Sequence, residues 1–232
     1  GKIDAILPVS VQVKGEVFGP TEGIKLYILE VKDTPKGPRI SVSRTHPDFV
    51  KRLFEAEVAE VKDGTVEIKA ISREPGSRTK MAVWSNDPNV DPVGACVGLN
   101  GARVNTVVNE LRGEKIDIIN WDDNPAYLIE NALSPAKVIY VAADEDAREA
   151  QVIVPDYQLS LAIGKEGQNA RLAARLTGYK IDIKSETQAR ELGLFDEMEQ
   201  YGDEYDSEYN NAEYDNYQGD YQENYQDDYQ EN

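Results

Sequence analysis

The chain has 232 residues, of which 40% are hydrophobic, and a formal net charge of −18 at pH 7. Residues 191–232 hold 15 acidic residues and no Lys or Arg, so residues 1–190 carry a net charge of only −3. This near-neutral part argues against binding nucleic acid through net positive charge alone, but it leaves room for a local basic groove. No run of about 18 apolar residues is present, which excludes a transmembrane helix.

The single cysteine, Cys96, excludes a disulfide within the chain and favours a reducing compartment. No signal peptide is recognisable at the start, where the chain begins at Gly1 rather than Met. We therefore expect a cytoplasmic monomer without membrane partners, present here as a fragment or a processed form.

Residues 1–45 have the pattern of β-structure. Two strands, over 24–31 and 39–43, are rich in large apolar residues and flank the turn Thr34-Pro35-Lys36-Gly37-Pro38. At most three strands fit in this segment, and a closed five-stranded OB barrel needs more chain. We predict the C-terminal part of an OB-type RNA-binding barrel.

An α-β-β-α-α-β order follows twice, which predicts an α+β fold. We expect one unit over 46–121 and a second over 122–186, packed as one rigid body because the connection over 121–124 is short. The predicted elements cover 47–59, 65–72, 79–85, 91–97, 102–111 and 115–119, then 125–133, 136–142, 149–154, 159–163, 168–176 and 180–183. Residues 187–232 are acidic, rich in Tyr and poor in aliphatic residues, so they are predicted to be a disordered tail.

A short motif recurs in the two units. Gly98-Leu99-Asn100-Gly101 is followed 66 residues later by Gly164-Lys165-Glu166-Gly167. Each copy precedes a predicted helix and the sequence Lys-Ile-Asp-Ile, whose Lys lies 14 or 13 residues after the second Gly. One Gly-x-x-Gly alone is weak evidence, but a repeat with matching flanks indicates two tandem type II KH domains.

The repeated motif predicts binding of single-stranded RNA. Glycines let the backbone approach a sugar-phosphate closely, and the following helix offers free N–H groups with a positive dipole end. Each unit would hold about four nucleotides. The candidate RNA-binding residues are the loop residues Gly98, Leu99, Asn100, Gly101, Gly164, Lys165, Glu166 and Gly167, with the cations Arg73, Arg78, Lys80, Arg103, Arg171 and Arg175.

The two loops differ in charge. The second has Lys165, and Arg171 and Arg175 lie four residues apart on one face of the next helix. The first loop has the uncharged Leu99-Asn100, so we expect stronger phosphate contact in the second. An alternative stays open, in which the glycines form a simple bend between helices and the basic residues lie on solvated faces.

Other chemistry finds no support in the sequence. His46, the only histidine, precedes Pro47 at a predicted helix start, where capping or a surface position is expected. One His and one Cys give neither a zinc set nor a Cys–His dyad, and no Gly-x-x-x-x-Gly-Lys-Ser/Thr is present. We expect no enzyme activity, no metal and no cofactor.

Five segments resemble the NusA family of bacterial transcription termination/antitermination factors. They are 71–83, 94–98 and 108–118 around the first motif, 161–173 around the second, and 37–47, which is similar to the end of that family's ribosomal-protein-S-one-type barrel. The resemblance covers about residues 1–186. It implies a transcription elongation factor that binds nascent RNA, RNA polymerase and other Nus factors, and modulates pausing, termination and antitermination.

The chain departs from the family in two ways. The family's polymerase-binding N-terminal domain is absent from this chain, and Asn100 stands where the first loop usually has a basic residue. The alternative is a KH/OB RNA-binding subunit of an RNA-processing or ribosome-associated assembly. Polynucleotide phosphorylase-like proteins place one KH domain before the barrel, however, and KH-containing GTPases need a P-loop.

Overall fold

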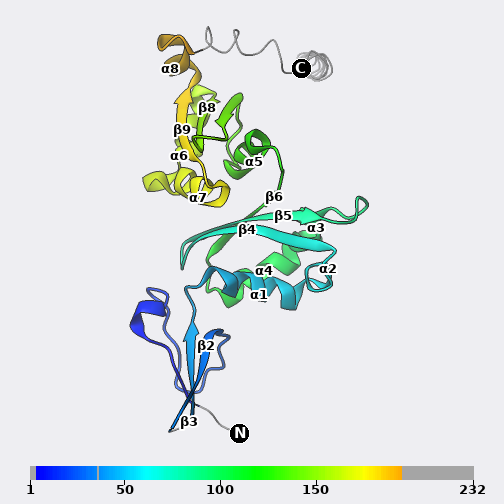
Figure 1. The fold of residues 1–232 in the computed structure, drawn as a ribbon, viewed down its shortest axis with the longest axis vertical. Helices are drawn as coiled ribbons and strands as arrows, with labels where there is room; N and C mark the ends of the chain where they lie inside the picture. The colour runs from blue at the N-terminus through cyan, green and yellow to red at the C-terminus, as the bar shows by residue number, and fades with distance from the viewer. Residues whose placement is uncertain (1–3, 36, 195–232) are drawn as a thin grey trace, which may run out of the picture. The chain divides into compact units, whose positions relative to one another are not determined.

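The computed structural model describes residues 4–35 and 37–194. The chain divides into two units, residues 1–186 and 187–232, and the described part of the second unit holds the end of helix α8 (Glu186–Glu191). The prediction of a disordered tail over 187–232 is wrong for residues 187–191, which belong to this helix, and residues 195–232 lie outside the described residues. Residues 4–185 form three small sheets, each with three strands, of which the second and third carry helices (Figure 1).

The first sheet has the strand order β1-β3-β2, with β1 (Ala5–Ile6), β2 (Tyr27–Thr34) and β3 (Gly37–Ser43). Strands β2 and β3 form the predicted antiparallel hairpin, and β1 lies parallel to β3. The short helix η1 (Val9–Val11) follows β1. Ile28 and Val31 are more than half exposed, so this sheet buries little apolar surface of its own. That it belongs to an OB barrel stays a prediction.

The first KH unit has the predicted order and a sheet β4-β5-β6, in which β5 pairs antiparallel with β4 and parallel with β6. Helix α1 (Pro47–Glu57) begins at His46, whose Nδ1 accepts the Asp48 N–H at 3.1 Å, which confirms the expected capping role. Phe49 and Phe54 of α1 are buried against the sheet core. The remaining elements are α2 (Ala59–Lys62), β4 (Val66–Glu74), β5 (Arg78–Ser85), α3 (Pro92–Val97), η2 (Leu99–Gly101), α4 (Ala102–Glu110) and β6 (Lys115–Asn120).

The second KH unit repeats this arrangement with the sheet β7-β8-β9. The strand expected over 136–142 begins only at Tyr140, because the Ala136 N–H bonds to the Leu133 carbonyl in a turn and Ala136 is buried in the core. The elements are α5 (Pro125–Ala132), β7 (Tyr140–Asp144), β8 (Glu149–Val154), η3 (Asp156–Gln158), α6 (Leu159–Ile163), η4 (Lys165–Gly167), α7 (Gln168–Thr177) and β9 (Lys180–Ser185).

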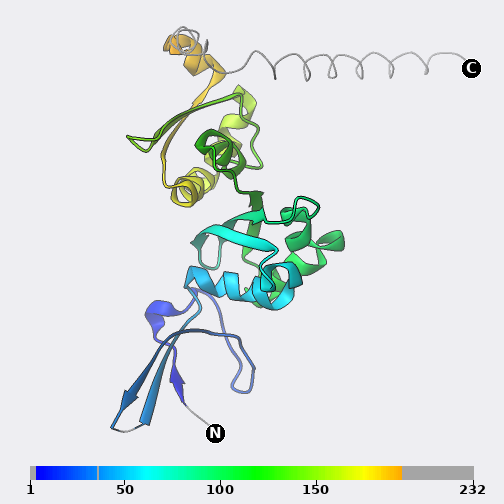
Figure 2. The same cartoon turned by 45° about the vertical axis from the view of Figure 1, so that its right-hand side comes forward.

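The hydrophobic core of the second KH unit extends into the first KH unit, which also has a separate core of its own. Ala82 of β5 and Ile119 of β6 belong to the same buried cluster as Ile129 of α5 and Leu176 of α7. Helix α7 accordingly lies against β4 and β5, as both views of the ribbon show (Figures 1 and 2). This apolar contact fixes the position of one Gly-x-x-Gly loop relative to the other within residues 46–186.

Candidate nucleic-acid interface

The two Gly-x-x-Gly loops follow the same backbone path. The first glycine has φ 72° and ψ 171° at Gly98, and φ 77° and ψ 171° at Gly164. The third residue is left-handed in both, with φ 51° at Asn100 and φ 52° at Glu166. The last glycine has φ 76° in one copy and 73° in the other. The sequence repeat therefore corresponds to a repeated three-dimensional structure.

Each motif needs its first glycine for space as well as for conformation. A Cβ at Gly164 would lie 2.8 Å from the backbone nitrogen of Asn169, and one at Gly98 would lie 2.7 Å from Cγ of Arg103. The start of the following helix thus packs directly on the loop. Since α4 begins after Gly101 and α7 after Gly167, the N-terminal N–H groups of each helix point toward its own loop.

The tips of both loops are open to solvent. Leu99 is 85% exposed, and Asn100, Lys165 and Glu166 are exposed as well. No ion pair of Lys165 occurs within the described part of the chain, so its ammonium group is available to a ligand. Glu166 sits beside it, however, and the second loop is formally as neutral as the first. The expected advantage of the second loop therefore depends on the arginines of α7.

Those arginines are already engaged. Arg171 binds the Glu74 carboxylate with both Nε and Nη2, at 2.6 and 3.1 Å, and Arg175 Nη1 lies 3.5 Å from the same carboxylate. Gln168 Nε2 also donates to Glu74, at 2.9 Å. The Arg171 hydrogen bond is the main reason that the pKa of Glu74 is lowered. The predicted phosphate contacts of Arg171 and Arg175 therefore compete with a carboxylate of the first unit.

The cation beside the first loop is also paired. Arg103 Nη1 donates to the Glu60 carboxylate at 3.1 and 3.2 Å and to the Ala95 carbonyl at 2.6 Å. Arg103 therefore connects α4 to α2 and to α3. Phosphate contact by Arg103 stays a prediction, and it would require the guanidinium to break its ion pair with Glu60.

Two predicted RNA-binding residues near the β4–β5 turn, Arg78 and Lys80, differ in exposure. Arg78 binds Asp117 with Nε and Nη2 at 2.7 and 2.9 Å and is partly exposed. Lys80 is buried, with Nζ 2.7 Å from the Ser134 carbonyl and 3.2 Å from Asp117. Burial lowers the pKa of Lys80, and although burial alone would raise the pKa of Asp117, its two cationic partners lower it. The prediction for Lys80 is corrected, because its ammonium is enclosed at the junction of the KH units.

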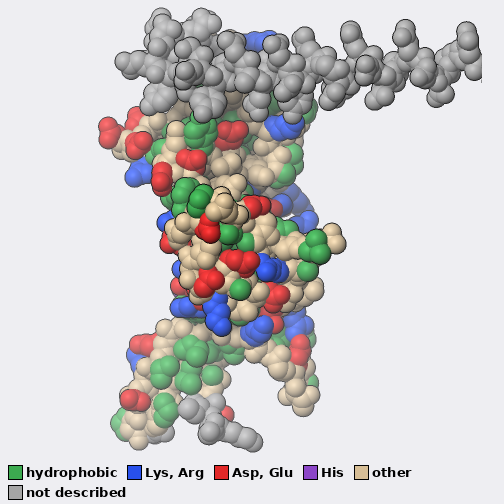
Figure 3. Space-filling view, turned by 90° about the vertical axis from the view of Figure 1, so that its right-hand side faces the viewer, with side chains coloured by type: hydrophobic (Ala, Val, Ile, Leu, Met, Phe, Trp, Pro, Cys, Tyr) green, Lys and Arg blue, Asp and Glu red, His purple; other side chains and the backbone are tan. Residues whose placement is uncertain are grey.

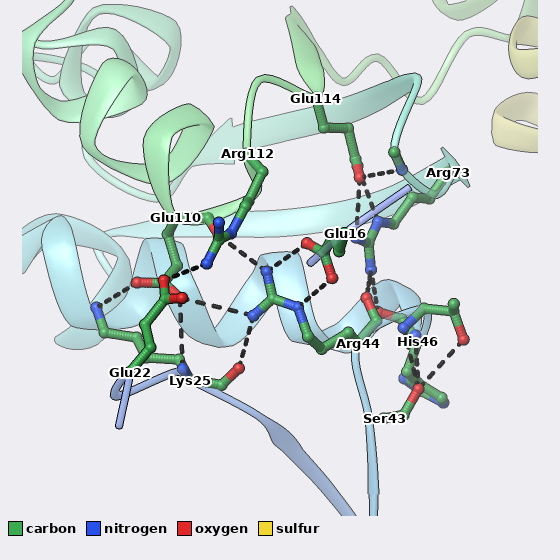
Figure 4. Close-up of polar contacts among 12 residues, drawn as sticks. Glu16, Glu22, Lys25, Ser43, Arg44, His46, Arg73, Glu110, Arg112 and Glu114 are labelled. Carbon is green, nitrogen blue, oxygen red and sulfur yellow. Dashed lines mark hydrogen bonds and ion pairs between the residues drawn. The ribbon is translucent and has the colours of Figure 1, made fainter. Parts of the chain in front are cut away.

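Arg73 requires the same correction. Its side chain is 1% exposed and binds Glu114 through Nε and Nη2, at 2.8 and 2.9 Å (Figure 4). Its Nη1 donates to the carbonyls of Arg44 and His46, at 2.8 and 2.9 Å. These contacts occupy all three guanidinium nitrogens of Arg73, so none is available to RNA. Arg73 instead connects the first KH unit to the segment that precedes it.

Arg44 is a buried residue that sequence reasoning did not single out. It binds Glu16 through Nε and Nη2, both at 2.6 Å, and donates to the carbonyls of Lys25 and Glu110 (Figure 4). Its guanidinium lies 5.2 Å from the ring centroid of Phe18. An isolated Arg after a strand has no sequence pattern that would reveal this role.

The surface shows no continuous basic face in the view of Figure 3, where acidic and basic side chains alternate over the KH units. Within residues 4–35 and 37–194, no group of His, Cys, Asp and Glu side chains could hold a metal ion. The helices of this part are also too short or too polar to cross a membrane. On the face seen in Figure 3, RNA contact would therefore depend on loop geometry and a few available cations.

Comparison with known proteins assigns both units. The family model of the NusA-like first KH domain matches residues 44–121, and that of the NusA-like second KH domain matches 125–191. The transcription termination/antitermination protein NusA of Bacillus subtilis (strain 168) is 58% identical over 216 residues, which cover 93% of this chain and 58% of the relative.

Two further relatives carry the same name. The protein of Halalkalibacterium halodurans is 59% identical over 85% of this chain and 52% of its own length. That of Mycobacterium tuberculosis (strain ATCC 25618 / H37Rv) is 53% identical over 79% of this chain and 53% of its own length. The chain thus spans between 52% and 58% of these curated relatives.

Proposed function

Because the chain belongs to the NusA family, we propose that it is the RNA-binding part of a transcription elongation factor, which holds single-stranded nascent RNA with two KH units. The observation that carries this proposal is the repeated backbone geometry of the loops at Gly98 and Gly164. Two equivalent loops, each opening a helix N-terminus toward solvent, supply two equivalent places for a sugar-phosphate backbone.

The wider role is also part of the proposal. We infer that the protein acts with RNA polymerase and other Nus factors in the cytoplasm, and modulates pausing, termination and antitermination. The names of the relatives support termination and antitermination. We assign residues 1–45 to the end of an OB barrel, 46–121 and 122–186 to the KH domains, and 187–232 to an acidic tail.

Because most cations near the loops are paired, we expect RNA affinity to depend more on the shape of the loops than on their charge. Arg103, Arg171 and Arg175 are paired within the protein, which leaves Lys165 as the available cation at the loops among the residues described. For single strands, a plot of the logarithm of the binding constant against the logarithm of the salt concentration has a slope of about −0.7 for each phosphate that the protein neutralises. A shallow salt dependence is therefore expected.

Glycine substitutions test the proposal. Asp at Gly101 and Gly167 would place a negative charge where a phosphate must lie, and about tenfold weaker binding is expected for each. The controls are Gly113→Asp and Gly178→Asp, because these glycines have similar positive φ values of 93° and 76° and open space around a new Cβ, but lie away from the loops. All four variants place Asp at a positive φ, and at Gly101 the new Cβ would also lie 3.1 Å from Nδ2 of Asn105.

Circular dichroism checks that each variant folds, and fluorescence anisotropy with an unstructured RNA measures affinity. The proposal predicts that the double variant Gly101→Asp/Gly167→Asp loses binding while the double control retains it. A folded double loop variant that binds RNA as tightly as the control would refute the two-loop proposal.

A further inference from the structure

The sheets of the two KH units have the same strand register. In the first unit β5 pairs with β6 from Arg78 and Lys115 onward, and in the second β8 pairs with β9 from Glu149 and Lys180 onward. Both parallel pairs therefore begin at the Lys of the repeated Lys-Ile-Asp-Ile sequence. This common register assigns residues of the second sheet to counterparts in the first.

One face of the first sheet is the docking surface for the second unit. Helix α7 lies between the two sheets and contacts β4 and β5 of the first unit as well as β9 of its own unit (Figure 1). Glu74, at the end of β4, binds Arg171 and Arg175, which lie one turn apart on α7. A sheet face with a carboxylate at its edge thus receives a helix that carries two cations at positions i and i+4.

The corresponding face of the second sheet is open. Its side chains alternate along the strands, and they are Ala142 and Asp144 of β7, Glu149 and Gln151 of β8, and Lys180 and Asp182 of β9. These residues and those between them line a hollow of about 550 Å³, which we call the outer face. Gln151 and Asp182 are exposed, whereas Ala150 and Val152 on the other side of the sheet are buried in the core.

The outer face repeats the carboxylates of the first docking surface. Asp144 corresponds to Glu74, because each residue pairs with the first residue of the next strand. Asp182 corresponds to Asp117, because each is the third residue of Lys-Ile-Asp-Ile. The second unit therefore presents on its free side the acidic positions that the first unit uses to hold the second.

Both carboxylates are accessible to a partner. Asp144 Oδ1 accepts the N–H groups of Asp146 and Ala147, both at 2.9 Å, which fixes the position of the side chain. Asp144 Oδ2 has no hydrogen-bond partner in the part of the chain that the structure describes. Asp182 is 55% exposed and pairs with Lys184 at 3.1 Å, and a solvated pair of this kind contributes little and is readily exchanged.

One difference between the sheets makes the outer face more acidic. In the first sheet Lys80 pairs with Asp117 at 3.2 Å and donates to the Ser134 carbonyl of the second unit. The register places Gln151 at the position of Lys80, so this cation is missing beside Asp182. The charged residues that line the outer face are Asp144, Glu149, Lys180 and Asp182. This excess of negative charge calls for a cation from the occupant.

We propose that the outer face of the second KH unit is a docking surface for a basic helix of another protein, which carries two Arg or Lys residues one turn apart, as α7 does. The negative charge of the face favours such a helix over RNA. Residues 191–232 hold no Lys or Arg, so the chain's own C-terminal segment does not supply these cations. Ala142, with its short side chain, leaves room for a helix to approach the sheet closely.

The probe is a fluorescent peptide with the sequence of α7, residues 168–177, extended by about four alanines at each end because shorter helices are unstable in water. Fluorescence anisotropy at low salt measures its affinity for the full chain. Asp144→Asn and Asp182→Asn should each weaken binding about three- to fivefold, and the double variant should weaken it about tenfold. The matched control is Asp63→Asn, because Asp63 is exposed and its Oδ1 accepts the Thr65 N–H at 2.9 Å, in the same way as Asp144 accepts that of Asp146.

A second peptide of the same composition, with its arginines two residues apart, separates helix docking from general attraction to a negative protein. It should bind the unaltered chain about tenfold more weakly than the α7 peptide, because its two cations lie on different faces of the helix. Circular dichroism checks that each variant folds.

Three results would overturn the proposal. The first is no saturable binding of the α7 peptide, and the second is equal binding of the two peptides or of the double variant and Asp63→Asn. The third is self-association of the chain that the double substitution abolishes, which would assign the outer face to a second copy. None of these results bears on RNA binding, since neither Asp144 nor Asp182 lies in a Gly-x-x-Gly loop.

Discussion

Arg171 of the second KH unit donates two hydrogen bonds to the carboxylate of Glu74 in the first, at 2.6 and 3.1 Å. Its Nη1 donates a third, at 3.0 Å, to the carbonyl of Glu166 in the second Gly-x-x-Gly loop. A carboxylate thus occupies the guanidinium for which we predict an RNA phosphate contact. The same fork geometry suits both anions. We therefore expect domain packing and RNA binding to compete for this side chain.

Removing this carboxylate should strengthen RNA binding. In Glu74→Gln, Arg171 and Arg175 lose their anionic partner and become available to phosphate, so affinity at low salt should rise about two- to fivefold and the salt slope should steepen. The free energy of unfolding should fall only slightly, because Arg171 is 42% exposed and the pair is screened by solvent. Fluorescence anisotropy across a salt series measures the effect.

The control for that experiment is Glu67→Gln. Glu67 lies on the same strand and pairs with Lys69 rather than with a residue of the second unit. Equal gains in affinity for the two variants would show that the effect is a general change in net charge, and would remove the competition between Glu74 and phosphate.

Acid should weaken the same contact. The pKa of Glu74 is lowered in the folded chain, chiefly by the Arg171 hydrogen bond, so the contact stabilises the fold fully above the ordinary carboxyl pKa of 4.5. That stabilisation is lost as the pH falls from there through the lower folded value. Urea unfolding from pH 7 to pH 3 should show the difference between the unaltered chain and Glu74→Gln shrinking over this range. A difference that is constant with pH would contradict the assignment.

The third residue of each loop offers a reciprocal exchange. Asn100 and Glu166 have nearly the same left-handed φ, which Asn tolerates better than Glu. Glu166→Asn should therefore raise the free energy of unfolding by about 0.5–1 kcal/mol and increase RNA affinity, because it removes a negative charge from the loop tip.

The reverse change, Asn100→Glu, should lower both quantities in the first loop. Thermal unfolding and RNA titration of the two variants make the comparison at matched backbone geometry. If neither exchange alters RNA affinity, the loop tips do not face the phosphates.

Arg73 should matter for folding and not for RNA. Arg73→Lys loses the two-pronged contact with the buried Glu114, so the free energy of unfolding should fall by about 2–4 kcal/mol. RNA affinity, measured where the variant is still folded, should be unchanged. Arg52→Lys serves as the control, because Arg52 pairs with Glu55 on an exposed helix face. Weaker RNA binding by a fully folded Arg73→Lys would restore the contact that its burial argues against.

The sequence predicts the loops well because their structure is local. Gly98 and Gly164 require positive φ and close packing by residues five positions away, so the motif itself contains the constraint. The order of helices and strands follows from hydrophobic periodicity for the same reason. A single sequence is sufficient to predict such local features.

The roles of the basic residues could not be predicted because their partners are distant in sequence. Arg171 lies 97 residues from Glu74, and Arg73 lies 41 residues from Glu114. A cation next to a binding motif has the same local pattern whether it faces phosphate or a buried carboxylate. Lys80 shows the consequence, since this lysine of strand β5 next to the β4–β5 turn is predicted at the surface but is enclosed beneath the second KH unit.

An NMR titration of the chain with an unstructured single-stranded RNA of about twelve nucleotides shows whether both loops hold RNA. We expect the backbone amides of Leu99 and Asn100 and those of Lys165 and Glu166 to shift together and to saturate at the same RNA concentration. RNA binding that leaves the amides of both loops unshifted would contradict this expectation.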